Sequence, residues 1–168
     1  NGEHNMRDNN ILITEMMKYY TGDPKRIQHF IKVHQFAKMI GEMEGLPEEE
    51  QHILETAAIV HDIGIKPAEE KYGSCGGKVQ EQEGPAVAEE ILQRLGYEPK
   101  VIDRVCYLVG HHHTYDQIDG SDYRILVEAD FLVNLYEDGV SKDPVKNAYD
   151  KIFRTETGHR MCSLMFSV

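Results

Sequence analysis

Apolar side chains recur at intervals of three and four residues through most of this chain, which is the spacing of an amphipathic α-helix. The alternation of apolar and polar residues that marks a half-buried strand is absent from the sequence. The pattern therefore predicts an all-α protein, a single globular helical domain of about six or seven helices. The predicted helices cover residues 11–20, 23–45, 47–64, 84–95, 99–112, 123–138 and 143–157.

Capping residues and glycines set most of these boundaries. Asp23 supplies an N-cap directly before a first-turn proline, and Gly45 is placed to end the same helix in a left-handed conformation. Residues 66–82 are irregular and rich in glycine, so a long loop is expected there, and Gly84 with Pro85 is expected to begin the next helix. Loops of this length in compact domains often carry function.

The composition fits one small domain, because 168 residues with 40% hydrophobic side chains supply an adequate core at this size. We interpret residues 1–22 as a polar N-terminal segment with a short helix packing on the core, and residues 23–168 as the main domain. Eighteen basic and 29 acidic residues give a net charge of −11, which argues against binding to a nucleic acid polymer or an anionic membrane. Three cysteines without metal-binding spacing, and no apolar run of about 18 residues, favour a cytoplasmic protein with reduced thiols.

Three side chains suited to metal binding lie on the apolar faces of three predicted helices. They are His34, His61 and Asp130, and Asp62 follows His61 directly. A buried ionised carboxylate such as that of Asp130 costs several kcal/mol unless a partner charge or a metal ion compensates it. A lone inward histidine is more often a hydrogen-bonded core residue, but the joint pattern favours a divalent-metal site.

The order of these residues resembles that of the HD superfamily of metal-dependent phosphohydrolases. The motif H…HD…D matches His34, the doublet His61 and Asp62, and Asp130, and the resemblance extends over roughly residues 23–157. It implies an all-helical fold that holds one or two divalent metal ions and most often cleaves phosphate esters, nucleotides above all. The ion is expected to be Fe, Mn, Co, Ni, Zn or Mg, because mixed imidazole and carboxylate ligands do not select one of them.

Two-metal relatives complete a second site with further histidines, and the run from His111 to His113 is similar to that region. Helical phase places His112 most inward, and the paired histidines of such relatives favour His111 and His112 as ligands. The alternative is one site histidine beside two solvated neighbours. Relatives often carry another histidine before Gly84, where this chain is acidic, so Glu83 is either a bridging ligand or an ordinary first-turn acid.

The resemblance also implies roles in catalysis. A bound ion lowers the pKa of a water molecule and polarises a phosphoryl oxygen, so that activated water attacks phosphorus. Asp62 is expected both to bind the ion and to orient that water. Many relatives place a lysine three residues after the doublet; Ile65 stands there, which leaves Lys66 as a candidate to bind substrate phosphate. The candidate catalytic residues are therefore Asp62, Lys66 and Glu83.

The expected activity is that of a phosphomonoesterase or phosphodiesterase acting on a small phosphorylated molecule, a nucleotide in the first instance. Some relatives use a histidine-rich di-iron pair for oxidative cleavage, and a di-iron oxygenase is the main enzyme alternative. A non-catalytic nucleotide-binding regulatory module is the alternative of another class, although such a module has no need of all four ligands. The sequence makes no prediction of the oligomeric state.

Overall fold

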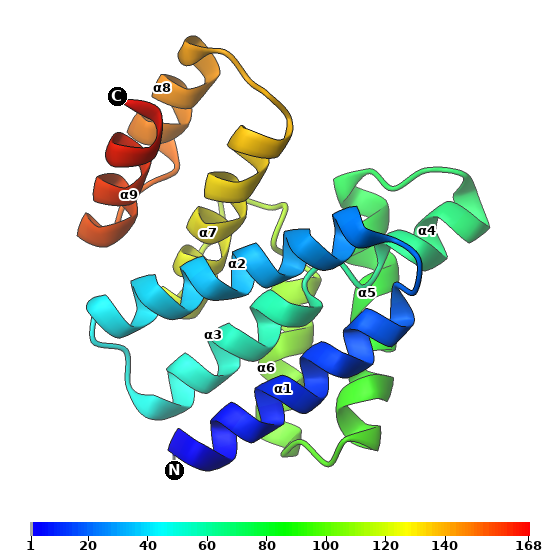
Figure 1. Cartoon of the computed structure of the whole chain (residues 1–168). Coiled ribbons are helices and arrows are strands. Elements are labelled where there is room, and N and C mark those ends of the chain that lie inside the picture. The colour runs from blue at the N-terminus through cyan, green and yellow to red at the C-terminus, as the bar shows by residue number, and fades with distance from the viewer. Residues whose placement is uncertain (1) are drawn as a thin grey trace.

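The computed structural model describes the backbone of residues 2–168 and the side chains of residues 9–168, and these residues form helices and turns without strands (Figure 1). The all-α prediction is thereby confirmed. None of the described helices is long and apolar enough to cross a membrane. The helices are α1 (Gly2–Tyr19), α2 (Pro24–Met43), α3 (Glu48–Val60), α4 (Ile65–Tyr72), α5 (Gly77–Arg94), α6 (Pro99–Val109), α7 (Ser121–Glu137), α8 (Lys142–Lys151) and α9 (Glu156–Phe166).

Helices α2, α3 and α7 form the centre of the molecule, since each of them packs against the other two. Around this centre, α1 packs on α3, α6 lies between α3 and α5, and the pair of α8 and α9 lies beside α7 (Figure 1). Helix α4 packs against α5, at the side of the molecule away from α8 and α9. The junction of α2, α3 and α7 is therefore enclosed by other helices.

Helix α1 is longer than the predicted helix at residues 11–20, because its backbone is helical from Gly2 onward. Leu12 and Met16 are fully buried. The apolar spacing thus predicted the turns of α1 that pack on the core, but it did not predict the helical turns before them. The side chains of residues 1–8 lie outside the described residues, and the division of the chain after residue 22 remains a prediction.

The expected long loop at residues 66–82 is mostly helical, so that prediction was wrong. Helix α4 occupies its first part, and the buried residues Ile65 and Ala68, three positions apart, give even this short helix an apolar face. Helix α5 begins at Gly77 and runs through Pro85 instead of starting there. Proline has no backbone N–H, so it costs no hydrogen bond in the first turn of a helix but costs one further along. A proline in a sequence therefore predicts a helix start.

The predicted last helix, residues 143–157, is in fact the two helices α8 and α9. The buried carboxylate of Glu128 accepts hydrogen bonds from the backbone N–H and the hydroxyl of Thr155, at 3.1 and 2.6 Å, and so fixes the turn between them. Gly158, expected to end a helix, lies in the first turn of α9, where a Cβ would clash with Glu128. Glycine is required at this position by the close contact, and not because a helix ends there.

Gly64 allows the backbone of α5 to approach the turn that follows α3. A Cβ at Gly64 would lie 2.5 Å from the carbonyl oxygen of Gln80 and 2.7 Å from the backbone nitrogen of Gly84. Both neighbours are main-chain atoms, so a side-chain rotation does not relieve the contact. The position of α5 therefore depends on the absence of a side chain at residue 64.

We expect Gly64→Ala to lower the free energy of unfolding by about 1–3 kcal/mol, because α5 has to move away from the turn. Urea denaturation followed by circular dichroism measures this loss. Gly76→Ser is the matched control, since a Cβ at Gly76 meets only Ser74 Oγ at 3.7 Å and serine is favoured at the start of a helix. Equal losses in the two variants would contradict the close-contact explanation.

Candidate metal centre

Side chains from the three central helices converge at their junction. His29 comes from α2, His61 and Asp62 from the turn after α3, and Asp130 from α7. The Nε2 atoms of the two histidines are 3.3 Å apart, and Asp62 Oδ2 lies 3.1 Å from each of them. Asp130 Oδ1 lies 3.3 Å from the first and 3.4 Å from the second. All four residues are buried, and we call them the central cluster.

The turn that carries the His61–Asp62 doublet is held in place by α1 as well as by α5. The hydroxyl of Tyr20 donates a hydrogen bond to the carbonyl oxygen of Asp62 at 2.8 Å. The hydroxyl of Tyr19 donates to the carbonyl oxygen of Ile63 at 2.9 Å, and Ile63 itself is fully buried. The backbone of the doublet is therefore fixed before any ligand binds, which is how a rigid binding site is built.

The histidine tautomers direct lone pairs into this junction. His61 Nδ1 lies 2.7 Å from the carbonyl oxygen of Ala58, and His112 Nδ1 lies 2.8 Å from that of Val109. A carbonyl oxygen only accepts, so in the neutral ring each Nδ1 carries the proton and each Nε2 presents a lone pair. Among the described residues, His112 Nε2 and Asp130 Oδ1 are buried without a hydrogen-bond partner. Acceptors that face one another in the interior fit a divalent cation with nitrogen and oxygen ligands.

The pKa values in the central cluster show the same demand for positive charge. Burial alone lowers the pKa of His29, but the carboxylates of Asp130 and Asp62 outweigh burial and raise it to about 9. Burial likewise opposes the two carboxylates at His61, and the pKa of His61 ends well above its usual value. Burial raises the pKa of both aspartates, yet the neighbouring imidazoles hold each of them below its usual value. The carboxylates stay ionised, and a divalent ion bound there would supply the charge that protons otherwise provide.

A second group of candidate ligands shares Asp62 with the central cluster. One ligand atom each from Asp62, His112 and His113 lie within 4.8 Å of one another, and we call these residues the second group. His112 Nε2 is 3.4 Å from Asp62 Oδ1, whereas Asp62 Oδ2 faces the central cluster. His113 Nε2 lies 3.0 Å from the amide oxygen of Gln80, and burial, followed by His112, lowers the pKa of His113 to about 4. The two oxygens of Asp62 thus face two different groups of candidate ligands.

The structure groups His112 with His113 and not with His111, its predicted partner. His111 turns away: its Nδ1 lies 2.7 Å from the carbonyl oxygen of Tyr107, and its ring stacks on the Tyr107 ring with centroids 4.0 Å apart. Helix α6 ends at Val109 and the histidines lie in the turns that follow. Helical phase therefore does not apply to them, and it gave no signal that His113 lies beside His112.

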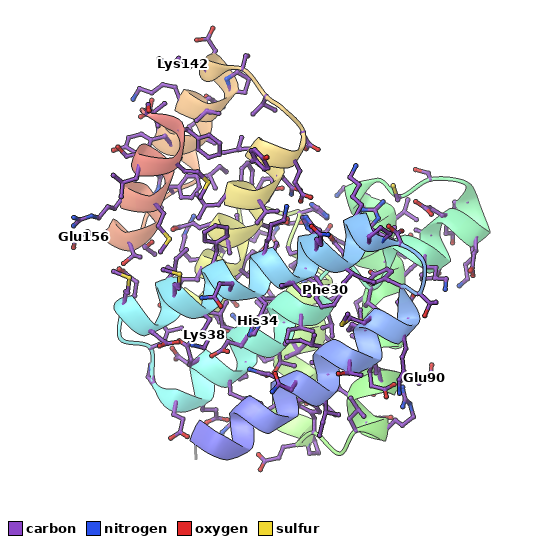
Figure 2. The ribbon with its side chains drawn as sticks, viewed as in Figure 1. Phe30, His34, Lys38, Glu90, Lys142 and Glu156 are labelled. Carbon is purple, nitrogen blue, oxygen red and sulfur yellow. The ribbon has the colours of Figure 1, made fainter. Side chains whose placement is uncertain are left out.

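His34, the predicted upstream ligand, is not brought to either group of ligands. Its Nε2 lies 3.1 Å from Glu55 Oε1 on α3, and it projects from the side of α2 seen in Figure 2. His29 occupies the expected place in the cluster. The two histidines are five residues apart, so they point roughly 140° away from each other around the helix. They flank opposite edges of one apolar stripe that includes Phe30 and Val33, and the stripe alone does not distinguish them.

The structure does not bring Lys66 or Glu83 to the ligands either. Lys66 Nζ donates a hydrogen bond to the carbonyl oxygen of Tyr19 at 3.1 Å and lies 5.1 Å from the centroid of the Tyr19 ring. Glu83 Oε1 lies 2.6 Å from Lys71 Nζ on α4. Glu81, two residues earlier and on the other side of α5, is the acid that contacts the histidine segment. The expected roles of Lys66 and Glu83 at the site therefore have no geometric support.

Comparison with known proteins points to one family. A family model described as the HD domain matches residues 26–147, a range that contains the central cluster and the second group. Among solved structures, the crystal structure of a predicted HD superfamily hydrolase from an uncultured Thermotogales bacterium is similar to this chain. It has 24% sequence identity and a TM-score of 0.65, and the match covers 96% of this chain and 84% of that one. A comparison with curated proteins finds no match.

Proposed function

Because the chain belongs to the HD domain family, we propose that it is a metal-dependent phosphohydrolase whose substrate is a small phosphate ester, a nucleotide in the first instance. The observation that carries the proposal is the convergence of His29, His61 and Asp130 with Asp62 at a buried junction. These four residues present lone pairs and ionised carboxylates to one another, and none of the four is a lysine or an arginine. A divalent cation is the group that satisfies them.

Each of the four residues has a proposed role. His29 and His61 would hold the cation through Nε2, and Asp130 would hold it through Oδ1. When bound, the cation lowers the pKa of a water molecule and polarises a phosphoryl oxygen of the substrate. Asp62 would hold the cation through Oδ2, while Oδ1, which lies 3.4 Å from His112 Nε2, would orient the attacking water when the second group holds no ion. Attack of this water on phosphorus releases the alcohol of the ester.

The overall charge of −11 does not conflict with an anionic substrate. A divalent cation at the junction reverses the sign of the local field, because a bound ion is the largest charge in its surroundings. The substrate is then drawn to the ion and not to the protein surface. We accordingly expect phosphate binding to depend on the loaded metal rather than on Lys66, whose Nζ contacts Tyr19.

The proposal is tested by measuring the metals in protein purified without chelator and then assaying metal-loaded protein. Nucleotides and generic phosphomonoesters and phosphodiesters form the panel, with Mn, Co, Ni and Fe as the added ions. Phosphate release that disappears with EDTA and returns with one ion is the expected result. Nucleotide binding without turnover under every metal would instead identify a regulatory module.

A di-iron oxygenase is the second candidate, and the shared position of Asp62 favours it. Asp62 lies between the central cluster and a second group rich in histidine, so two ions bound by these groups would lie close together. Bound iron at two ions per chain, with consumption of oxygen and no phosphate release, would select this activity. Hydrolysis under nitrogen would exclude it as the main reaction.

We expect two ions per chain in the wild type and one after His112→Ala, because His112 belongs to the second group alone. Elemental analysis of the metal-loaded proteins gives the count. His111→Ala is the matched control and should keep two ions, since the His111 ring stacks on Tyr107 outside the second group. One ion in the wild type and in both variants would rule out the second site.

A further inference from the structure

A carboxylate from the end of α7 contacts the one central histidine that comes from α2. His29 Nδ1 lies 2.5 Å from Glu137 Oε1, while His29 Nε2 faces the central cluster. The other oxygen of Glu137 lies 3.4 Å from Lys32 Nζ. The side chain of Glu137 is 13% exposed, so solvent screens this pair only weakly. One imidazole therefore connects a partly buried carboxylate to the candidate ligand position.

We infer that Glu137 is a positioning residue that fixes the ring of His29 and strengthens its Nε2 as a metal ligand. The inference rests on the proposed metal-dependent function. A carboxylate that accepts the Nδ1 proton holds the ring in one tautomer and orientation, and its negative charge makes the opposite nitrogen a better donor to a metal.

His29 needs such a partner more than the other histidines do. His61 and His112 each direct Nδ1 to a carbonyl oxygen three residues earlier, so their own backbone turns orient them. The local backbone offers His29 no such partner among its described contacts, and Glu137 is 108 positions away in the sequence. The contact thus joins α2 to α7 at the point where both supply a residue to the central cluster.

A second histidine–glutamate pair on the same helix provides the control. His34 Nε2 lies 3.1 Å from Glu55 Oε1, and the side chains are 12% and 10% exposed, against 10% and 13% for His29 and Glu137. Both glutamates thus join α2 to a neighbouring central helix from equally buried positions. Only the pair with Glu137 leads to the central cluster. A purely structural role predicts similar consequences for both pairs, whereas a positioning role does not.

The experiment titrates Co²⁺ into metal-free protein by calorimetry and compares Glu137→Gln, Glu137→Ala and Glu55→Gln with the wild type. Glutamine keeps an oxygen that accepts the Nδ1 proton and removes the charge, so we expect the Kd for Co²⁺ to rise about tenfold. Alanine removes the acceptor as well, and the Kd should rise by up to about 100-fold. Glu55→Gln should leave the Kd for Co²⁺ within about twofold of the wild type while lowering the thermal midpoint.

A spectroscopic readout separates positioning from stability. In the Co²⁺-loaded wild type, the paramagnetic ion shifts the NMR signal of the His29 Nδ1 proton, and the Glu137 contact protects that proton from exchange. Glu137→Ala should abolish the protected signal, and Glu55→Gln should retain it. A Kd unchanged in both Glu137 variants would overturn the positioning role while leaving the proposed function intact. Failure of the wild type to bind Co²⁺, Mn²⁺, Ni²⁺ or Fe²⁺ would overturn both.

Discussion

Replacement of Asp62 by alanine is expected to abolish tight metal binding and hydrolysis together. One oxygen of this carboxylate lies 3.1 Å from two imidazole nitrogens of the central cluster, and the other lies 3.4 Å from His112. Among the described residues no second carboxylate lies near both groups, because Asp130 Oδ1 lies beside His29 and His61 of the central cluster. The variant therefore loses a ligand and the group that orients water, and its turnover should fall by at least about 10²–10⁴-fold.

The measurement pairs elemental analysis of the purified variant with single-turnover release of phosphate from the best substrate of the panel. Glu55→Ala is the matched control, because Glu55 and Asp62 are both 8% exposed but Glu55 lies outside the candidate ligands. The control should lose stability and keep its metal. Full metal content in Asp62→Ala would show that Asp62 is not a ligand, and full activity would contradict both of its proposed roles.

Helical periodicity was sufficient to predict most of the fold, because burial on one side of a helix leaves a trace in the order of the residues. The predicted positions of α2, α3, α6 and α7 follow from such stripes. Helix α4 was missed and the start of α5 was misplaced, for different physical reasons. Helix α4 is too short for a repeated stripe, and α5 continues through Pro85, where local rules favour a helix start.

The glycines illustrate the same limit. A glycine in a sequence signals either a left-handed helix end or a close contact, and only the folded chain distinguishes them. Gly45 and Gly73 have positive φ values of 75° and 68° and end helices. A Cβ at Gly64 would meet Gln80 and Gly84, and a Cβ at Gly158 would meet Glu128, and these three residues are 16 or more positions away in the sequence. Contacts of this kind arise from tertiary packing, which periodicity does not encode.

The candidate site shows where one-dimensional spacing stops being informative. His61 and Asp130 are buried and face each other, as their helical phase predicted. His111 to His113 follow the last turn of α6, so the 100° rotation per residue no longer describes them. For α2 the predicted apolar stripe was correct, but a histidine stands at each edge of that stripe. The choice between them depends on which edge of the stripe faces Asp130 on α7 and which faces Glu55 on α3.

Replacement of each histidine of α2 by alanine tests the choice between His29 and His34. We expect His29→Ala to lower the affinity for Co²⁺ by at least about 100-fold, a larger effect than the loss of an outer hydrogen-bond partner. His34→Ala should leave the affinity for Co²⁺ unchanged. The reason is geometric: His29 Nε2 lies 3.1 Å from Asp62 and 3.3 Å from Asp130, whereas His34 Nε2 lies 3.1 Å from Glu55.

Both variants remove one imidazole of nearly equal exposure from the same helix, so each serves as the control for the other. Calorimetric titration of the metal-free proteins gives the affinities, and thermal unfolding without metal gives the cost of losing each imidazole. At one Co²⁺ concentration the thermal midpoint should rise strongly for His34→Ala and little for His29→Ala, because a ligand at free concentration c raises the free energy of unfolding by RT ln(1 + c/Kd). The reverse order of affinities would restore His34 as the ligand and would require α2 to rotate by roughly 140° relative to α7.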